Sequence, residues 1–135
     1  MDLAPLLVIV ALLAGATVIG LRVRHRDGRL RPAAAGERIL EVPLGERGTL
    51  LQLSSAACAS CPGTARLLGT IAERRPGIRH VELDVDEHPE LVARLRVLQT
   101  PTTLILDADG AVRSRIGGPA RPDAVEDAIE RLDAP

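Results

Sequence analysis

Residues 49–64 read TLLQLSSAACASCPGT, a mostly apolar run that leads directly into both cysteines of the chain. An apolar run of this kind is typical of a strand that is buried on both faces of a sheet. Small and apolar residues then recur at helical spacing until the sequence RRPG at 74–77 ends the pattern. The stretch therefore predicts a strand that runs into a helix, with Cys58 and Cys61 at the junction. The residues on this helical face are Ala65, Leu67, Leu68, Ile71 and Ala72.

The sequence after this helix alternates between strand and helix patterns. Residues 78–86 alternate apolar and polar side chains, which predicts a second strand, and the sequence DADG at 107–110 marks the turn of a hairpin. Right-handed crossovers make the first two main strands parallel and cover both faces of the sheet. The chain is therefore expected to be an α/β protein. The other predicted elements are a short strand at 39–42, helices at 87–98 and 121–132, and hairpin strands at 102–106 and 111–116.

The cysteine pair has several possible uses. Two cysteines are too few for a four-thiolate zinc site, and the loop between them is too small for a structural disulfide to restrict the unfolded chain much. A CxxC pair can, however, bind Cu(I) or supply half of an intermolecular zinc site. The domain could also be a non-catalytic scaffold whose thiols have no role. The three histidines, His25, His80 and His88, have no spacing that indicates a ligand set, so no metal site is expected from them.

A redox role follows if the helix begins near Cys58. The free N–H groups and positive end of the helix dipole would then favour a thiolate at Cys58, which would be the nucleophile. Cys61, three residues later, would lie on the same helical face and could resolve the mixed disulfide that Cys58 forms. Pro62 fits the first turn, where its missing N–H is least costly.

These features resemble the thioredoxin family over residues 38–135. In that family a cis proline on a distant loop lies against the active-site sulfurs and opens a hairpin strand, and Thr100-Pro101 in the sequence TPTTLIL fits this pattern. The Asp-Gly turn and the pair Gly117-Gly118 agree as well. The resemblance implies a mixed sheet flanked by helices, and Thr100 and Pro101 beside the cysteines as substrate-binding and catalytic residues. It also implies protein thiol or disulfide substrates, an electron-donating redox protein and no cofactor.

The sequence departs from the family pattern beside the cysteines. Ala57 stands where thioredoxins usually have tryptophan, and Ala59-Ser60 replaces the usual Gly-Pro, so the redox potential cannot be carried over. The family's buried aspartate falls on Gln52, and its lysine partner falls on Glu82. We hypothesise that the carboxylate has moved to Glu82 and serves Cys61 as a general base; the alternative is a surface glutamate on a strand face.

The N-terminal end of the thioredoxin pattern is short. Between Arg38 and Thr49 there is too little sequence for the family's initial strand and helix. A trimmed fold is expected.

The first 21 residues predict a transmembrane helix. Leu3 to Leu21 carry no charge and would be about 28 Å long as a helix, close to the thickness of the hydrocarbon core. A cleaved signal peptide is the alternative, but it normally opens with a basic region, whereas this chain opens with Met1-Asp2.

An arginine-rich stretch follows the predicted transmembrane helix. The sequence RVRHRDGRLR at 22–31 contains five arginines, and the positive-inside rule then places the soluble domain in the cytoplasm. The expected organisation is a helix at 1–21, a basic linker at 22–37 and the domain at 38–135.

Composition excludes some classes of partner. The formal net charge is −1 and the chain has no aromatic residue, so a nucleic-acid module that stacks bases on aromatic rings is not expected. The core must be built from Leu, Val, Ile and Ala.

Overall fold

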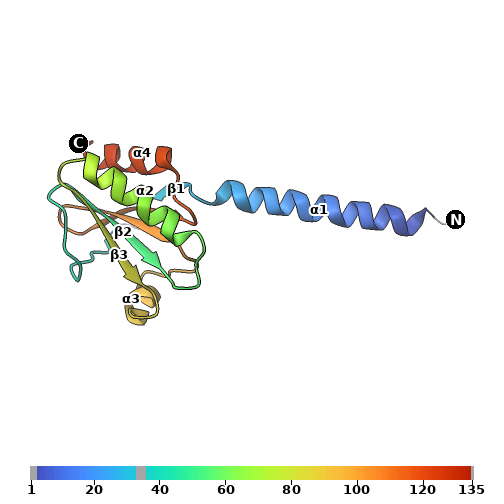
Figure 1. The fold of residues 1–135 in the computed structure, drawn as a ribbon, viewed down its shortest axis with the longest axis horizontal. Helices are drawn as coiled ribbons and strands as arrows, with labels where there is room; N and C mark the ends of the chain where they lie inside the picture. The colour runs from blue at the N-terminus through green and yellow to red at the C-terminus, as the bar shows by residue number, and fades with distance from the viewer. Residues whose placement is uncertain (1–2, 33–35, 135) are drawn as a thin grey trace.

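The computed structural model describes residues 3–32 and 36–134. A long helix, α1, extends away from an α/β domain in which helices cover a central sheet (Figure 1). The elements in chain order are α1 (Ala4–Arg26), β1 (Leu30–Pro32), β2 (Gly48–Ser54), α2 (Cys61–Arg74), β3 (Ile78–Asp84), α3 (Pro89–Arg94), β4 (Thr102–Asp107), β5 (Val112–Gly117) and α4 (Pro122–Leu132).

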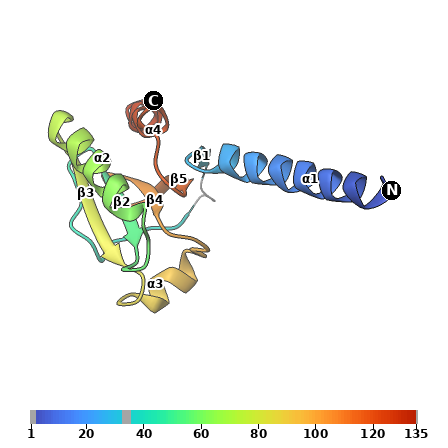
Figure 2. The same cartoon turned by 45° about the vertical axis from the view of Figure 1, so that its right-hand side comes forward.

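The sheet has five strands in the order β1-β5-β4-β2-β3. The β2 and β3 strands are parallel, as the crossover through α2 requires, and the other neighbours are antiparallel. Helices α2 and α4 lie on one face, and α3 lies on the other (Figure 2). This is the mixed, helix-flanked sheet that the sequence predicts.

The β2 strand, between β4 and β3, contributes to both core layers, because successive side chains in a strand point to opposite faces. Leu50 packs toward α2 and α4, whereas Leu51 and Leu53 pack toward α3. All seven residues of β2 are buried, in agreement with the apolar run in the sequence.

The short strand expected at 39–42 is not formed. One isolated bridge joins Arg38 to Ala111, and beyond it the segment crosses the α3 face of the sheet as irregular chain. Ile39 is nevertheless fully buried, and its N–H donates to the carbonyl oxygen of Gly110 at 2.8 Å. Segment 36–47 therefore covers, with α3, the face that the trimmed N-terminal end leaves without a helix.

Helix α3 ends earlier than the predicted 87–98. Its last residue is Arg94, because Val97 N–H bonds back to Val92 and Arg96 adopts a left-handed backbone with a φ of 49°. A residue in this conformation closes a helix.

The region expected to be a basic linker contains regular structure. Helix α1 continues through Arg26, and Leu30–Pro32 pairs with β5 at the edge of the sheet opposite β3. The predicted linker at 22–37 lies partly outside the described residues. The domain boundary at residue 38 stays a prediction.

Candidate active site

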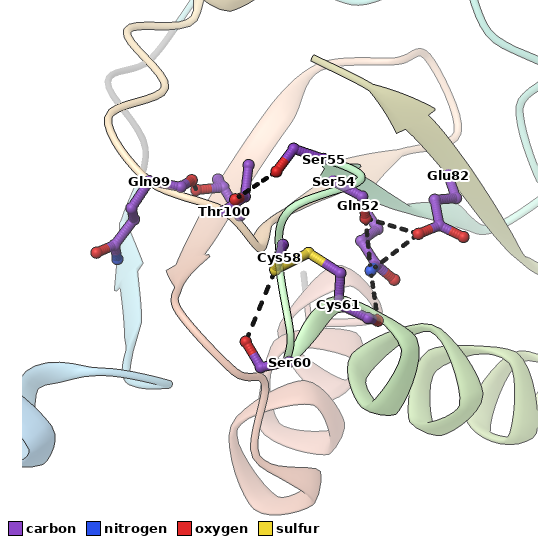
Figure 3. Close-up of a disulfide and its surroundings, with 10 residues drawn as sticks. Gln52, Ser54, Ser55, Cys58, Ser60, Cys61, Glu82, Gln99 and Thr100 are labelled. Carbon is purple, nitrogen blue, oxygen red and sulfur yellow. Dashed lines mark hydrogen bonds between the residues drawn. A yellow bond between two sulfur atoms is a disulfide. The ribbon is translucent and has the colours of Figure 1, made fainter. Parts of the chain in front are cut away.

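Cys58 lies in the turn between β2 and α2, Cys61 is the first residue of α2, and the two form a disulfide (Figure 3). Helix α2 begins at Cys61, so the expectation that it begins near Cys58 is wrong. Cys58 belongs to the preceding turn, in which Cys61 N–H donates to the Cys58 carbonyl oxygen at 3.3 Å. The reason is local: Pro62 fits a first helical turn and therefore favours a start just before it.

This turn gives the two cysteines different environments. Cys61 is 3 % exposed, whereas Cys58 is partly exposed. The Ser60 hydroxyl lies 3.8 Å from Cys58 Sγ, where it can donate to a thiolate. Ser60 was not predicted as a site residue, although serine just before a helical pattern is a known signal for a helix N-terminus.

The proline loop lies beside the cysteine turn. The Thr100-Pro101 peptide is cis, and Pro101 is buried. Thr100 Oγ1 is 3.3 Å from Ser55 Oγ, which connects the loop to the residue that follows β2 (Figure 3). The structure thus brings together the two segments that the sequence pattern predicts to be neighbours.

A polar network lies under Cys61. Gln52 is fully buried, and its Nε2 donates to the Cys61 carbonyl oxygen at 3.0 Å and to Ser54 Oγ at 2.8 Å. Ser54 Oγ in turn donates to Glu82 Oε1 at 2.6 Å, and Gln52 Nε2 is 3.3 Å from the same oxygen. Gln52 and Glu82 are paired in register on β2 and β3. The Glu82 side chain is exposed at the edge strand, but this oxygen is held toward the network.

His80 closes the other side of the network. Its Nε2 is 3.2 Å from Gln52 Oε1, so the ring nitrogen donates to this amide oxygen. The two amide hydrogens of Gln52 are then shared among the acceptors on Cys61, Ser54 and Glu82. Burial lowers the pKa of His80, and the nearby charge of Glu82 opposes that shift. Ser54 and His80 were missed in the sequence; their signal is strand alternation, which puts them on the same sheet face as Gln52 and Glu82.

One hydroxyl in this layer has no partner. Thr103 pairs in register with Gln52, and in the described part of the chain its Oγ1 is the buried side-chain polar atom without a hydrogen bond.

Comparison with known proteins is consistent with this geometry. No protein-family model matches the chain. The sequence is 30 % identical to thioredoxin H5 of Oryza sativa subsp. japonica over 95 residues, which cover 70 % of this chain and 69 % of that protein. The chain belongs to the thioredoxin family.

Solved thioredoxin structures share the fold. Oxidised mitochondrial thioredoxin 3 from Saccharomyces cerevisiae superposes with a TM-score of 0.56 at 27 % identity, covering 64 % of this chain and 79 % of that one. Chloroplastic thioredoxin z gives a TM-score of 0.58 at 26 % identity, covering 67 % and 81 %. With its CxxC disulfide, this thioredoxin is a protein-disulfide oxidoreductase.

In this thioredoxin, residues 3–32 and 36–134 contain no group of three or more His, Cys, Asp or Glu side chains placed to hold a metal ion. Helix α1 is long and apolar enough to be a membrane span or a signal sequence.

Proposed function

We propose that this thioredoxin is a membrane-anchored reductase of protein disulfides, with Cys58 as the nucleophile. The observation that carries the assignment is the difference in exposure: Cys58 is partly open to solvent and Cys61 is 3 % exposed. A large substrate reaches the outer sulfur, whereas the inner sulfur is protected from competing reactions.

The proposed reaction has two exchanges. The Cys58 thiolate attacks one sulfur of a substrate disulfide, forms a mixed disulfide and releases the other substrate sulfur as a thiolate. The Cys61 thiolate then attacks Cys58 Sγ, releases the second substrate thiolate and closes the Cys58–Cys61 disulfide. The substrate gains two electrons, and an electron-donating redox protein restores the dithiol. Thr100 and Pro101 would hold an extended substrate segment beside the turn.

Trapping tests these roles. Cys61→Ser should accumulate mixed disulfides with protein substrates, because no resolving thiol remains, and Cys58→Ser should accumulate none. The opposite pattern would exchange the two roles.

Loss of both cysteines should abolish insulin reduction; if the Cys58→Ser/Cys61→Ser protein kept its cellular role, the domain would be a scaffold. A Cu(I) or Zn²⁺ titration of the reduced protein tests the metal-binding alternative.

We also propose that Glu82 is the general base for Cys61, with Gln52 and Ser54 as positioning residues. The support is the chain of contacts from the Cys61 carbonyl through Gln52 to Glu82 Oε1. Glu82→Gln should change the pH dependence of disulfide reduction while Ser54 and Gln52 keep a hydrogen-bonding partner. An unchanged pH profile would make Glu82 a surface glutamate.

The anchor is the apolar helix α1, and the arginines after it favour a cytoplasmic domain. A single cysteine introduced by Glu130→Cys, on the exposed side of α4, into the Cys58→Ser/Cys61→Ser background reports sidedness. Protection from an impermeant maleimide in intact cells would support the cytoplasmic orientation. Rapid labelling would reverse it and assign the domain to extracytoplasmic disulfides.

A further inference from the structure

A cavity of about 330 Å³ lies where the end of α1 meets the domain. Its walls come from α1, β1, β5 and the chain between α3 and β4, and Figure 2 shows β1 and β5 beside the end of α1. Gly28 N–H donates to the Gly117 carbonyl oxygen at 2.7 Å, and β1 pairs with β5 directly afterwards. The cavity is therefore held by sheet hydrogen bonds, and it is separate from the cysteine turn.

The cavity is strongly basic. Arg26, Arg31, Arg96 and Arg115 line it, against one carboxylate, that of Asp27. Within residues 3–32 and 36–134, none of these arginines forms an ion pair. The Arg115 guanidinium donates to the backbone carbonyl oxygens of Leu95 and Arg96, which fixes its position at the wall. The cavity thus has a net positive charge and unused donors, which suit an anion.

Arg96 occupies a backbone position that arginine does not favour. Its φ of 49° is left-handed, a conformation that glycine and asparagine adopt more easily. The site therefore has a basic side chain where helix closure alone would favour a smaller residue.

The cavity also lies at a defined distance from the apolar part of α1. The uncharged run ends at Leu21, and Arg26 is about 8 Å further along the helix axis. The headgroup layer of a bilayer is about 5–8 Å thick on each side of the hydrocarbon core. Leu98, another lining residue, is 94 % exposed and can insert at the same level.

We infer that this cavity binds the phosphate headgroup of an anionic phospholipid and so docks the redox domain on the membrane surface. The inference rests on the proposed anchoring by α1. An acidic protein segment has similar chemistry, but Val23 and Arg26 of α1 form one wall, which places the occupant next to the membrane-spanning part. Gln99 and Thr102 also line the cavity on either side of Thr100-Pro101, so docking would hold the substrate loop near the membrane.

A fluorescent reporter can test the docking directly. The chain has no tryptophan, tyrosine or phenylalanine, so Leu98→Trp gives a single fluorophore at the cavity in the full-length protein. The protein is reconstituted into phosphatidylcholine vesicles with or without phosphatidylglycerol, each carrying brominated acyl chains as quencher. We expect a blue shift and strong quenching only with phosphatidylglycerol. Arg31→Gln/Arg96→Gln should reduce the docking constant about 25-fold, since each arginine near an anionic surface contributes about fivefold.

Matched variants separate charge from folding. Arg31→Lys/Arg96→Lys keeps both positive charges and should keep most of the quenching. Arg74→Gln/Arg79→Gln removes two exposed arginines that do not line the cavity, and the quenching should be unchanged. Insulin reduction measured on the same vesicles reports whether the proposed function survives in each variant.

Three results would overturn the inference. If the protein resisted carbonate extraction but its fluorescence did not depend on phosphatidylglycerol, the membrane anchor would stand and the lipid site would be rejected. Release by carbonate would reject the anchor and the lipid site together. If Arg31→Gln/Arg96→Gln slowed reduction of an acidic disulfide peptide but not of a neutral one, with quenching unchanged, the cavity would recognise protein instead.

Discussion

Removing the Ser54 hydroxyl tests whether the network under Cys61 is a fixed part of the fold. In Ser54→Ala, the 2.6 Å bond to Glu82 Oε1 and the 2.8 Å bond from Gln52 Nε2 are lost. Hydrogen bonds to charged groups contribute about 1.5–3 kcal/mol to the free energy of unfolding. The Glu82 side chain is exposed, so we expect the lower end, about 1.5 kcal/mol. Gln52 keeps the Cys61 carbonyl and Glu82 as acceptors, so no buried group is left without a partner.

The loss should appear as a fall in Tm. At about 4–8 °C for each kcal/mol in a domain of roughly 100 residues, Ser54→Ala should melt about 6–12 °C lower. Far-ultraviolet circular dichroism of the oxidised full chain is the assay, because the sequence has no aromatic residue for fluorescence.

A double-mutant cycle identifies the partner. Ser54→Ala and Glu82→Ala should be coupled by about 1 kcal/mol, because each removes the hydrogen bond between Ser54 Oγ and Glu82 Oε1. Ser55→Ala is the control: within residues 3–32 and 36–134 its hydroxyl makes a single contact, 3.3 Å from Thr100 Oγ1, and the change should cost under about 0.5 kcal/mol. The network would be refuted if the Ser54→Ala protein had the same Tm as the wild type, or if the coupling free energy between positions 54 and 82 were near zero.

Three other changes probe the same layer and the trimmed end. Burial lowers the pKa of His80, so the unfolded chain takes up a proton at this histidine before the folded chain does as the pH falls. The free energy of unfolding should therefore be highest above about pH 6.5 and decline below it, and His80→Gln should flatten that decline in urea titrations. Thr103→Val replaces a buried hydroxyl that has no hydrogen-bond partner among the described residues with a methyl group and should raise the free energy of unfolding by about 1 kcal/mol in the same titrations; a loss would mean that the hydroxyl is satisfied. Gly110→Ala would place Cβ 2.4 Å from the Ile39 carbonyl oxygen at a φ of +76° and should cost about 2 kcal/mol or more, whereas a neutral result would mean that segment 36–47 does not cross there.

The sequence predicts the parts of this fold that depend on local pattern. The apolar run at 49–54 becomes the buried β2 strand, and strand pairing puts Gln52 opposite Glu82, as the family pattern implies. The position of Thr100-Pro101 in the family pattern correctly predicts the cis peptide beside the cysteine turn.

What the sequence does not predict depends on contacts between distant segments. The β1 strand has three residues and no periodicity, and its formation depends on pairing with β5, more than eighty positions later in the chain. Segment 36–47 is held by the Gly110 carbonyl and by burial of Ile39 and not by a strand ladder. The basic cavity likewise combines arginines from three separate parts of the chain: the stretch at 22–31, the segment after α3 and the β5 strand.

The most direct test of the central claim is the reactivity of the two thiols in the reduced protein. Brief alkylation with iodoacetamide, followed by peptide mass spectrometry, gives a separate rate for each cysteine. We predict that Cys58 reacts at least about tenfold faster than Cys61, because Cys58 is partly exposed and its Sγ lies beside the Ser60 hydroxyl, whereas Cys61 is 3 % exposed. Equal rates, or faster modification of Cys61, would contradict the assignment of Cys58 as the nucleophile.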